Sequence, residues 1–276
     1  MEHALLPLAI QAAISSASGL GLSVEDAVLV HNSNRIAVRL LPCNVLARIA
    51  SDRDRLGAHL EVEIARLLAQ TDNSVALLEP RVAPSVYETM AFVVTFWTYY
   101  ELLPGEIAAT DYARALNKMH AGMRTIADPP APHFTTRVAE ALRLVGDRDR
   151  SPSLSEVDRH FLHETLERLT REITRRGAGE QLLHGEPHAG NLMRTTEGLL
   201  FMDLETCCRG PVEFDVAHAP EEVSKEYPDL DHNLLRDCRV LALAMVTTWR
   251  WDRHDQLPDG RYWGRRWIKQ LRLIVD

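Results

Sequence analysis

The sequence predicts an α+β protein with two lobes, a small antiparallel β lobe over residues 1–98 and a larger, mostly helical lobe over residues 99–276. Two observations favour this division. Short apolar runs separated by turn residues are concentrated before residue 98, whereas apolar residues at helical spacing dominate the remainder. The chain of 276 residues is also long enough to build two lobes.

Strand-forming runs occupy most of the first lobe. A helix is predicted over residues 5–17, and it ends where two glycines allow the backbone to turn. Short runs rich in β-branched and aromatic residues follow, separated by polar turn clusters such as His31–Asn34. They predict strands over residues 27–30, 35–40, 45–50, 76–84 and 90–97. We expect these strands to form one antiparallel sheet.

An amphipathic helix is predicted between the third and the fourth of these strands. Its apolar stripe, which we expect to face the lobe, is formed by Leu56, Leu60, Ile64 and Leu67. Glu63 lies one turn from two of these leucines and therefore flanks the stripe. Glu61 points further away from the stripe.

Helices dominate the second lobe. A first helix over residues 110–120 is followed by a Pro-rich connector over residues 128–132. The run 153–156, Ser-Leu-Ser-Glu, has the pattern of a capping box and opens a long helix that closes near Gly177. Apolar and amphipathic patterns predict two more helices, over residues 239–249 and 260–276.

One polar loop and the strand after it carry the strongest functional signal. The loop reads HGEPHAGN over residues 184–191, and an apolar strand over 199–202 leads to Asp203. Kinase catalytic loops have the pattern H-x-D-x-x-x-x-N, in which the Asp is the base and the Asn binds metal, and a second Asp downstream holds Mg²⁺. The same offsets give Glu186, Asn191 and Asp203 here. Amide and carboxylate oxygens suit a hard cation such as Mg²⁺.

Two other interpretations compete with phosphoryl transfer. His184 and His188 lie four residues apart with a Glu between them, which resembles the zinc-binding motif H-E-x-x-H of metalloproteases. Gly185 and Pro187 oppose the helix that this motif requires, so the sequence disfavours a zinc hydrolase. The second interpretation is an ordinary loop followed by a buried strand, in which Asp203 only caps local structure.

The runs HGEPHAGNLM (184–193) and LLFMDLETCCRGPVEFDVA (199–217) resemble the catalytic core of the aminoglycoside phosphotransferase family. The usual family form is HGDxHxxNLL, then an apolar strand, a D-x-E motif and a G-P-x-x-x-D-x-A tail. The resemblance implies a protein-kinase-like fold with ATP between two lobes. Position 186 departs from the pattern, because Glu stands where the family usually has Asp. The carboxylate is kept, but the additional methylene changes its reach to a substrate hydroxyl.

The resemblance implies a small-molecule kinase that moves the γ-phosphoryl group of ATP or GTP to a hydroxyl of an aminoglycoside, an amino sugar or another small acceptor. Glu186 would position and deprotonate that hydroxyl, and Asn191 and Asp203 would bind Mg²⁺. His184 would shape the loop, and Asp215 is expected to be a structural acid at the start of a helix. The substituted base leaves a rival, a catalytically attenuated or inactive relative that binds a nucleotide or metabolite.

The kinase layout also assigns nucleotide contacts in the first lobe. Kinases carry a Lys on the third strand that pairs with the ATP phosphates and with a helix Glu. Arg48 is the single cation among apolar neighbours in the corresponding run. We assign Arg48 to the phosphates, with Glu63 as its partner, although Arg differs from Lys in shape. The alternative is a surface arginine on an edge strand.

The hinge whose backbone would contact the adenine has two possible registers. A hinge over residues 97–99 follows a strand of ordinary length, whereas a hinge over residues 101–103 requires an unusually long strand. The first register is preferred, and it makes Trp97 and Tyr99 candidate nucleotide-binding residues. The alternative is that these aromatic side chains only pack in the core and at its rim.

Composition limits the partners and the compartment. The net charge is −8, from 39 acidic and 31 basic residues, which argues against nucleic acid because such binding depends on Lys and Arg. An acidic run over residues 220–231 suits a cationic acceptor or is a solvated loop. No apolar run reaches the roughly 18 residues of a membrane span. The four cysteines form no C-x-x-C pair and no disulfide framework, so we expect a cytoplasmic protein.

Overall fold

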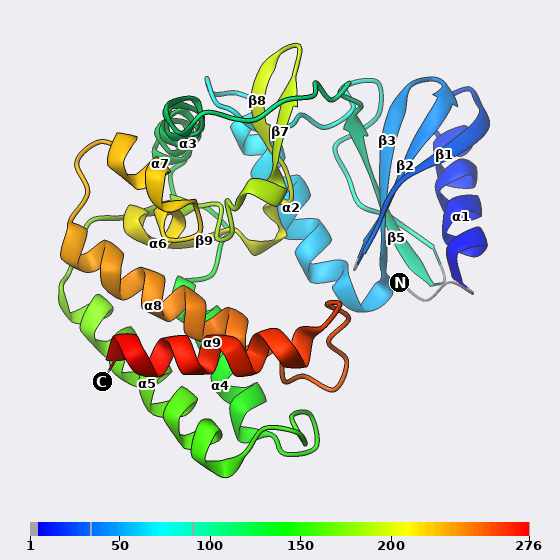
Figure 1. The fold of residues 1–276 in the computed structure, drawn as a ribbon. Coiled ribbons are helices and arrows are strands. Elements are labelled where there is room, and N and C mark those ends of the chain that lie inside the picture. Colours follow the sequence, from blue (N-terminus) through cyan, green and yellow to red (C-terminus); the bar gives the residue numbers. More distant parts are fainter. Residues whose placement is uncertain (1–4, 34, 90, 276) are drawn as a thin grey trace. The chain divides into compact units, whose positions relative to one another are not determined.

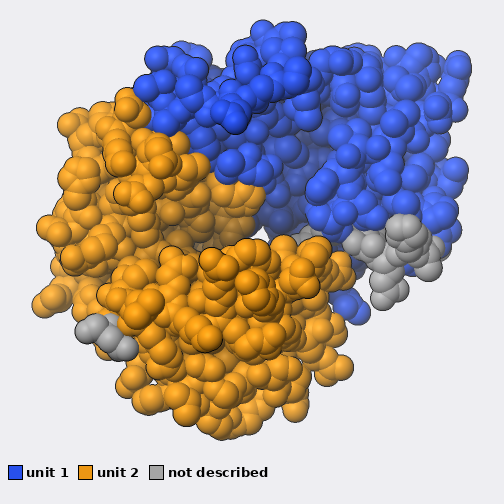
Figure 2. Space-filling view, viewed as in Figure 1, with its two compact units in different colours: residues 1–131, 189–207 blue, residues 132–188, 208–276 orange. Residues whose placement is uncertain are grey.

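The structure is a computed structural model that describes residues 5–33, 35–89 and 91–275. The chain forms two compact units, which Figure 2 colours separately. Unit 1 comprises residues 1–131 and 189–207, and unit 2 comprises residues 132–188 and 208–276. The fold is α+β and bilobal, with an antiparallel sheet in the N-terminal lobe and a mostly helical C-terminal lobe, so the predicted fold class is confirmed. The lobe boundary at residue 98 stays a prediction.

Unit 1 contains a five-stranded antiparallel sheet, with the strand order β1-β2-β3-β5-β4 (Figure 1). Its strands are β1 (Val24–Asn32), β2 (Ile36–Pro42), β3 (Val45–Ser51), β4 (Tyr87–Glu88) and β5 (Phe92–Thr98). The strand predicted over residues 76–84 is wrong, because only isolated bridges form near Val75 and Leu78. Pro80 and Pro84 lack the amide hydrogens that a continuous ladder needs. Asn34 and Met90, which belong to a predicted turn and a predicted strand, lie outside the described residues.

Helix α1 (Leu6–Gly19) covers one face of this sheet (Figure 1). Its buried positions are Ala9, Ala13 and Ala17, which share one helix face because they are four residues apart. They belong to the same core as Ile36 and Val38 of β2. Alanine side chains allow the helix backbone to lie close to the sheet, so α1 is held by close approach more than by long apolar side chains.

Helix α2 (Arg55–Leu68) follows the short helix η2 (Asp52–Asp54) and buries a different face from the one expected. Leu56, the first leucine of the predicted stripe, is 84% exposed. The buried face is formed by Ala58, Glu61, Val62, Ile64, Ala65 and Leu68. The predicted stripe was misleading because only Ile64 of its four residues is fully buried, and the buried face includes Ala58, Ala65 and Leu68, which the leucine pattern did not single out.

Unit 1 also contains helix α3 (Ala109–Arg124) and a hairpin of β7 (Leu192–Thr195) and β8 (Gly198–Phe201). The short helices η3 (Ala189–Asn191) and η4 (Leu204–Thr206) flank the hairpin. The segment after β5 is joined to β7, since the amide of Leu103 donates to the carbonyl of Arg194 at 2.8 Å. Val75 and Phe201 form a parallel bridge on the other side of the hairpin. The hairpin is therefore fixed within unit 1 on both sides.

Unit 2 is mostly helical and contains one two-stranded ladder of β6 (Glu180–Leu183) and β9 (Cys208–Pro211). Its helices are α4 (Phe134–Gly146), α5 (Glu156–Arg175), α6 (Val212–Val216), α7 (Glu221–Glu226), α8 (His232–Trp249) and α9 (Gly260–Val275). The cap of α5 is Ser155, which accepts from the amide of Asp158 at 3.1 Å, so the predicted box starting at residue 153 is two residues early. Asp276 of the predicted last helix lies outside the described residues. None of the helices over the described part of the chain is long and apolar enough to cross a membrane.

Candidate phosphoryl-transfer site

The hairpin brings Asn191 and Asp203 to the same end of two neighbouring strands. Leu192 is opposite Phe201 in the β7–β8 register, and the amide of Met202 donates to the carbonyl of Asn191 at 3.0 Å. Asn191 is therefore the residue just before β7, and Asp203 lies two residues after β8. The hydrogen-bonded backbone of the hairpin therefore holds these two candidate metal-binding residues near each other in unit 1.

Asp203 adopts a left-handed backbone conformation, with φ 71° and ψ 63°. Such a conformation costs most L-residues roughly 1–2 kcal/mol, and Asp and Asn tolerate it best outside glycine. It turns the chain from β8 into η4. The carboxylate is held from the sheet, because Nη2 of Arg48 donates to its Oδ1 at 2.7 Å. Side chain and backbone together give Asp203 a defined direction.

Arg48 lies on the central strand β3 and is only 6% exposed. Its second guanidinium nitrogen, Nη1, forms an ion pair with Oε1 of Glu61 on α2. Burial lowers the pKa of Arg48, but the charges of Glu61 and Asp203 more than offset this effect, and the net pKa is raised. The guanidinium therefore stays charged at physiological pH.

The acidic partner of Arg48 is Glu61 and not Glu63, which corrects the sequence prediction. Glu61 has no exposed surface, whereas Glu63 lies toward solvent and pairs with Arg66 at 2.6 Å. The cause is the rotation of α2 described above, by which the alanine face, and with it Glu61, is turned inward. Positions 61 and 63 lie about 160° apart around a regular helix, so the rotation that buries Glu61 carries Glu63 outward.

A second buried arginine, which the sequence analysis did not single out, completes this network. Nη1 of Arg35 lies 2.6 Å from Oε2 of Glu61, and Nη2 forms an ion pair with Glu205. The backbone amide of Leu204 donates to Oε1 of Glu61 at 3.2 Å. One carboxylate thus joins β3, α2, η4 and the residue just before β2. The available signal was Arg35 itself, a cation at the start of an apolar strand.

Glu205, the last residue of the D-x-E motif, has an unusual protonation equilibrium. Burial raises its pKa, the charge of Arg35 opposes that rise, and the neighbouring charges of Asp203 and Glu61 add to it, so that the pKa is raised to about 7. Asp203 and Glu205 both lie after β8, and each contacts a different arginine. Arg48 contacts Asp203, and Arg35 contacts Glu205.

The predicted hinge residues lie at the end of β5. This strand has seven residues, an ordinary length, and Tyr99 is the first residue beyond it. Trp97 lies inside the strand opposite Leu46, its side chain is buried, and its indole nitrogen donates to Thr95 at 2.9 Å. The ring of Tyr99 is covered by Arg39, with Cζ 4.0 Å from the ring centre. A contact of Trp97 or Tyr99 with nucleotide stays a prediction.

In unit 2 the loop that carries Glu186 is anchored by Asp215. This fully buried carboxylate accepts from the amide of His184 at 2.7 Å and from the amide of Gly185 at 2.8 Å. Gly185 has a φ of 90°, a conformation that favours glycine. His184 is fully buried and accepts from the amide of Glu186 through Nδ1 at 3.4 Å. Asp215 therefore acts as a structural acid that fixes the loop upstream.

Glu186 forms an ion pair with Arg137 of α4, with 2.6 Å between Nη2 and Oε1. Burial raises the pKa of Glu186, but the charges of Arg137 and His218 more than offset this effect, and the net pKa is lowered. Arg137 is 49 residues upstream, and nothing in its local sequence distinguishes it from other helix arginines, so sequence reasoning did not find it.

The structure does not have the helix that a zinc hydrolase of the H-E-x-x-H type requires at residues 184–188. Residues 184–188 are not helical, His184 is buried and His188 is exposed. Among the described residues, no group of three or more His, Cys, Asp or Glu side chains is arranged to hold a metal ion. Mg²⁺ bound with a nucleotide takes only one or two protein carboxylates, together with phosphate oxygens and water. The donor chemistry of Asn191 and Asp203 fits that kind of site.

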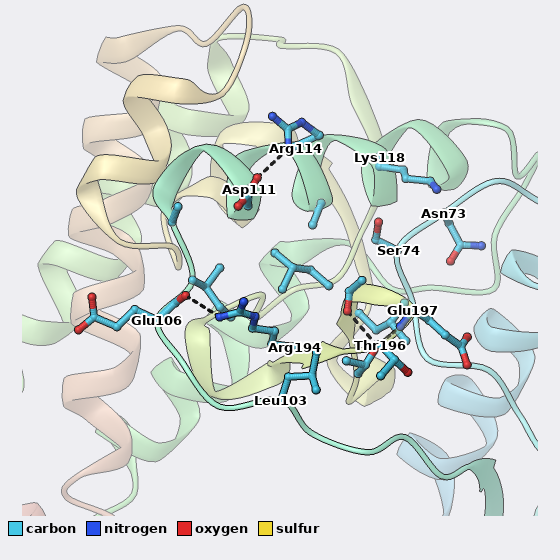
Figure 3. Close-up of a pocket in the computed structure, with 17 residues that line it drawn as sticks. Asn73, Ser74, Leu103, Glu106, Asp111, Arg114, Lys118, Arg194, Thr196 and Glu197 are labelled. Carbon is cyan, nitrogen blue, oxygen red and sulfur yellow. Dashed lines mark hydrogen bonds and ion pairs between the residues drawn. The ribbon is translucent and has the colours of Figure 1, made fainter.

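A separate pocket of about 570 Å³ lies within unit 1, between α3 and the β7–β8 hairpin (Figure 3). Two of its cations form ion pairs inside the unit, Arg114 with Asp111 at 2.7 Å and Lys118 with Asp72 at 2.6 Å, and Arg194 donates to the carbonyls of Pro104 and Glu106. Of the described residues that line it, none is a predicted catalytic, metal-binding or nucleotide-binding residue. Glu186 belongs to unit 2, whereas Asn191 and Asp203 belong to unit 1, so the convergence of the three stays a prediction.

An antiparallel sheet with a buried cation on its third strand, a helix carboxylate that pairs with it and an Asp after a hairpin define a kinase-like fold. A model of the phosphotransferase enzyme family (APH) matches residues 27–242, and the chain belongs to this family. No curated protein sequence matches the chain.

Solved structures of kinases share the fold over nearly the whole chain. A structure of amicoumacin kinase with AMP-PNP, Ca²⁺ and amicoumacin is 13% identical, with a TM-score of 0.72, and covers 98% of this chain and 96% of its own. Choline kinase from Streptococcus pneumoniae is 12% identical, with a TM-score of 0.70 and coverages of 96% and 99%. The GDP complex of aminoglycoside 2′-phosphotransferase-IIIa is 11% identical, with a TM-score of 0.69 and coverages of 97% and 99%. At these identities the similarity shows the fold.

Proposed function

We propose that the protein is a small-molecule kinase that transfers the γ-phosphoryl group of ATP or GTP to a hydroxyl of a small acceptor. The observation that supports this most is the contact of Arg48 with both Glu61 and Asp203. These residues come from a strand, a helix and a hairpin end that are far apart in sequence, and phosphoryl transfer needs a cation and a metal-binding carboxylate positioned in this way.

Each residue has a role in this proposal. Glu186 orients the acceptor hydroxyl and accepts its proton, and the anchored loop holds it in place. Arg48 contacts the phosphates and is steadied by Glu61, and the aromatic residues Trp97 and Tyr99 contribute to the nucleotide site at the end of β5. A phosphate next to Arg48 would be bound by a charged donor that is already oriented, which lowers the cost of binding.

Mg²⁺ is the metal that we propose for Asn191 and Asp203. When bound, it would neutralise charge on the nucleotide phosphates. The chain's contribution is to present an amide and a carboxylate from neighbouring strand ends, with the carboxylate direction fixed by Arg48. Oxygen donors of this type suit Mg²⁺ better than the softer transition metals.

The acceptor class that we propose is a hydroxylated amine. The relatives of known structure are kinases of amicoumacin, of choline and of aminoglycosides, and the last two compounds carry a hydroxyl group together with a cationic nitrogen. The net charge of −8 and the acidic residues at 221, 222, 226, 229 and 231 favour a cationic acceptor over an anionic one.

A direct test is acceptor-dependent release of ADP or GDP. Purified protein with Mg²⁺ and either ATP or GTP would be screened against aminoglycosides, amino sugars, choline-like alcohols and neutral sugars. We expect release above the acceptor-free rate with at least one hydroxylated amine, and a phosphorylated product by mass spectrometry. Binding of nucleotide without product from any acceptor would reject the proposal.

A second candidate function is a nucleotide- or metabolite-binding protein with attenuated catalysis. It is favoured by the longer carboxylate at position 186, which is also paired with Arg137. The variant Glu186→Asp separates the two candidates. Higher turnover than wild type would identify an attenuated enzyme, whereas nucleotide binding with no turnover in either form would favour the binding protein.

A further inference from the structure

The carboxylate of Glu186 is connected to a helix of the same unit by Arg137. Arg137 lies in the first turn of α4, and its Nη2 donates to Oε1 of Glu186 at 2.6 Å. The arginine side chain is 16% exposed and the glutamate side chain 32% exposed. A charge-assisted hydrogen bond of this length between largely buried groups is stronger and better oriented than a surface pair.

Both ends of this contact are fixed to one core. Phe134 begins α4, is almost fully buried, and packs on Phe214 with 5.2 Å between ring centres. A Cβ at Gly210 of β9 would lie 3.0 Å from Phe134, so the helix start and the β6–β9 ladder are in close contact. The ladder leads directly into the loop that Asp215 holds. The spacing between Arg137 and Glu186 is therefore set by backbone packing.

The contact with Arg137 restrains the long side chain of Glu186. Glu has one more methylene and one more rotatable bond than the Asp that the family motif usually carries at this position. An unrestrained Glu would lose more conformational entropy on reaching the acceptor, and reacting groups must be held within a fraction of an ångström of the productive geometry. The ion pair restrains Oε1, which leaves the direction of Oε2 defined as well.

Two buried polar atoms belong to residues that interact with Glu186. Nη1 of Arg137 and Nε2 of His218 are buried, and neither has a hydrogen-bond partner among the described residues. Buried polar atoms are seldom left unpaired, and exceptions occur at functional sites. Nη1 can donate to an oxygen of a bound molecule next to the carboxylate.

We propose that Arg137 is a positioning residue for Glu186: it binds one carboxylate oxygen and directs the other toward the acceptor hydroxyl, which compensates for the additional methylene. The proposal rests on the proposed role of Glu186 as the base. Arg137 itself needs no contact with the transferred phosphoryl group.

A double-mutant cycle tests the positioning role. With an acceptor found in the screen, Arg137→Met should lower kcat roughly 10- to 100-fold, the range expected when a reacting group is misplaced by about 1 Å. In a Glu186→Asp background the shorter side chain no longer reaches the arginine, so the same substitution should change kcat less than about threefold. Equal losses in both backgrounds would overturn the proposal. Arg137→Lys keeps the charge but not the planar fork, and serves if the Met variant does not fold.

A second readout does not depend on turnover. Titratable or charged groups that face Glu186 are Arg137 on α4, His188 in the loop, Cys208 on β9 and His218 after α6. The arginine charge favours the carboxylate, so its removal should raise the pKa of Glu186. The ¹³C signal of its carboxyl carbon, assigned by its loss in Glu186→Gln, should titrate at higher pH in Arg137→Met than in wild type. No difference would reject the contact.

The two readouts separate failure of this proposal from failure of the proposed function. If no acceptor is phosphorylated but the ¹³C titration moves, the role of Glu186 as a base fails and the contact with Arg137 stands. Arg176→Met is the matched control, because Arg176 pairs with Asp237 at the same distance of 2.6 Å in the same unit. It should leave kcat and the titration of Glu186 unchanged.

Discussion

Two arginine–glutamate contacts, Arg48–Glu61 in unit 1 and Arg137–Glu186 in unit 2, differ in burial. Glu61 has no exposed surface, and each of its carboxylate oxygens contacts a different arginine. Glu186 is 32% exposed and contacts one arginine. The first contact is closed off as part of the core, whereas the second leaves a carboxylate that solvent, and so a small molecule, can approach.

This difference in burial means that the two arginine–glutamate ion pairs serve different purposes. Taking several charges out of water is costly, and the cost is offset only while every partner stays in place. In unit 1 several charges are buried together, and Arg48 of this network fixes the direction of the Asp203 carboxylate. The unit 2 pair is less buried, so its effect on stability is smaller, and its proposed effect is on the position of Glu186.

The largest expected effect is the loss of turnover on substitution of Asp203, which contacts Arg48 in the unit 1 network. Asp203→Ala should abolish nucleotide turnover with folding retained, and Asp203→Asn, which also tolerates the left-handed backbone, should lower it by at least about 100-fold, as for loss of one oriented electrostatic group. Acceptor-dependent ADP release measures the loss, and circular dichroism checks the fold. Unchanged turnover in the Asn variant would show that the metal assignment is wrong.

Neighbouring glutamates on α2 provide the next comparison. Glu61→Ala leaves two buried arginines without their shared partner and should lower the free energy of unfolding by about 3–5 kcal/mol. Glu63→Ala removes a pair near the surface and should change it by less than about 0.5 kcal/mol. Urea unfolding of both variants measures the difference. Similar values for the two would contradict the burial of Glu61.

Where an arrangement depends on residues close together in sequence, the sequence was sufficient to predict the arrangement. The offsets from His184 to Asn191, and the Asp that follows an apolar strand, are set by one loop and one hairpin, and the structure brings Asn191 and Asp203 to the same hairpin end. Arg48 was found because a lone cation in an apolar strand must have a partner or a ligand.

The partners of these residues required tertiary packing. Glu61 and Glu63 differ by two positions on one helix, and the buried side, which includes Ala58, Ala65 and Leu68, is not the side that the leucine pattern indicated. Arg137 and Arg35 are ordinary arginines in their own segments, and only the fold brings them to Glu186 and Glu61. Residues 76–84 have strand-like composition, but their prolines leave only isolated bridges.

The anchor of the loop that carries Glu186 should show an intermediate effect on stability. Asp215→Asn keeps the shape but replaces one charged acceptor oxygen by an amide that cannot accept the bond from His184 or Gly185. We expect the free energy of unfolding to fall by about 1.5–3 kcal/mol, the range for hydrogen bonds to a charged group. Asp231→Asn is the control, because Asp231 also accepts from two backbone amides but caps α8 in solvent, where Asn is an equally good cap. Equal destabilisation by both would contradict a buried anchor.

The smallest expected effect concerns the pH dependence of the pair in unit 2. The pKa of Glu186 is lowered in the folded state, so its ionised form stabilises the fold above the pKa of an unfolded glutamate, about 4.3. That contribution is lost as the pH falls through the lowered folded pKa, since both states then bind the proton. The difference in free energy of unfolding between wild type and Glu186→Gln should therefore be largest near pH 7 and shrink toward pH 3. A difference independent of pH over this range would mean that the charge of Glu186 is not coupled to Arg137 in the folded protein.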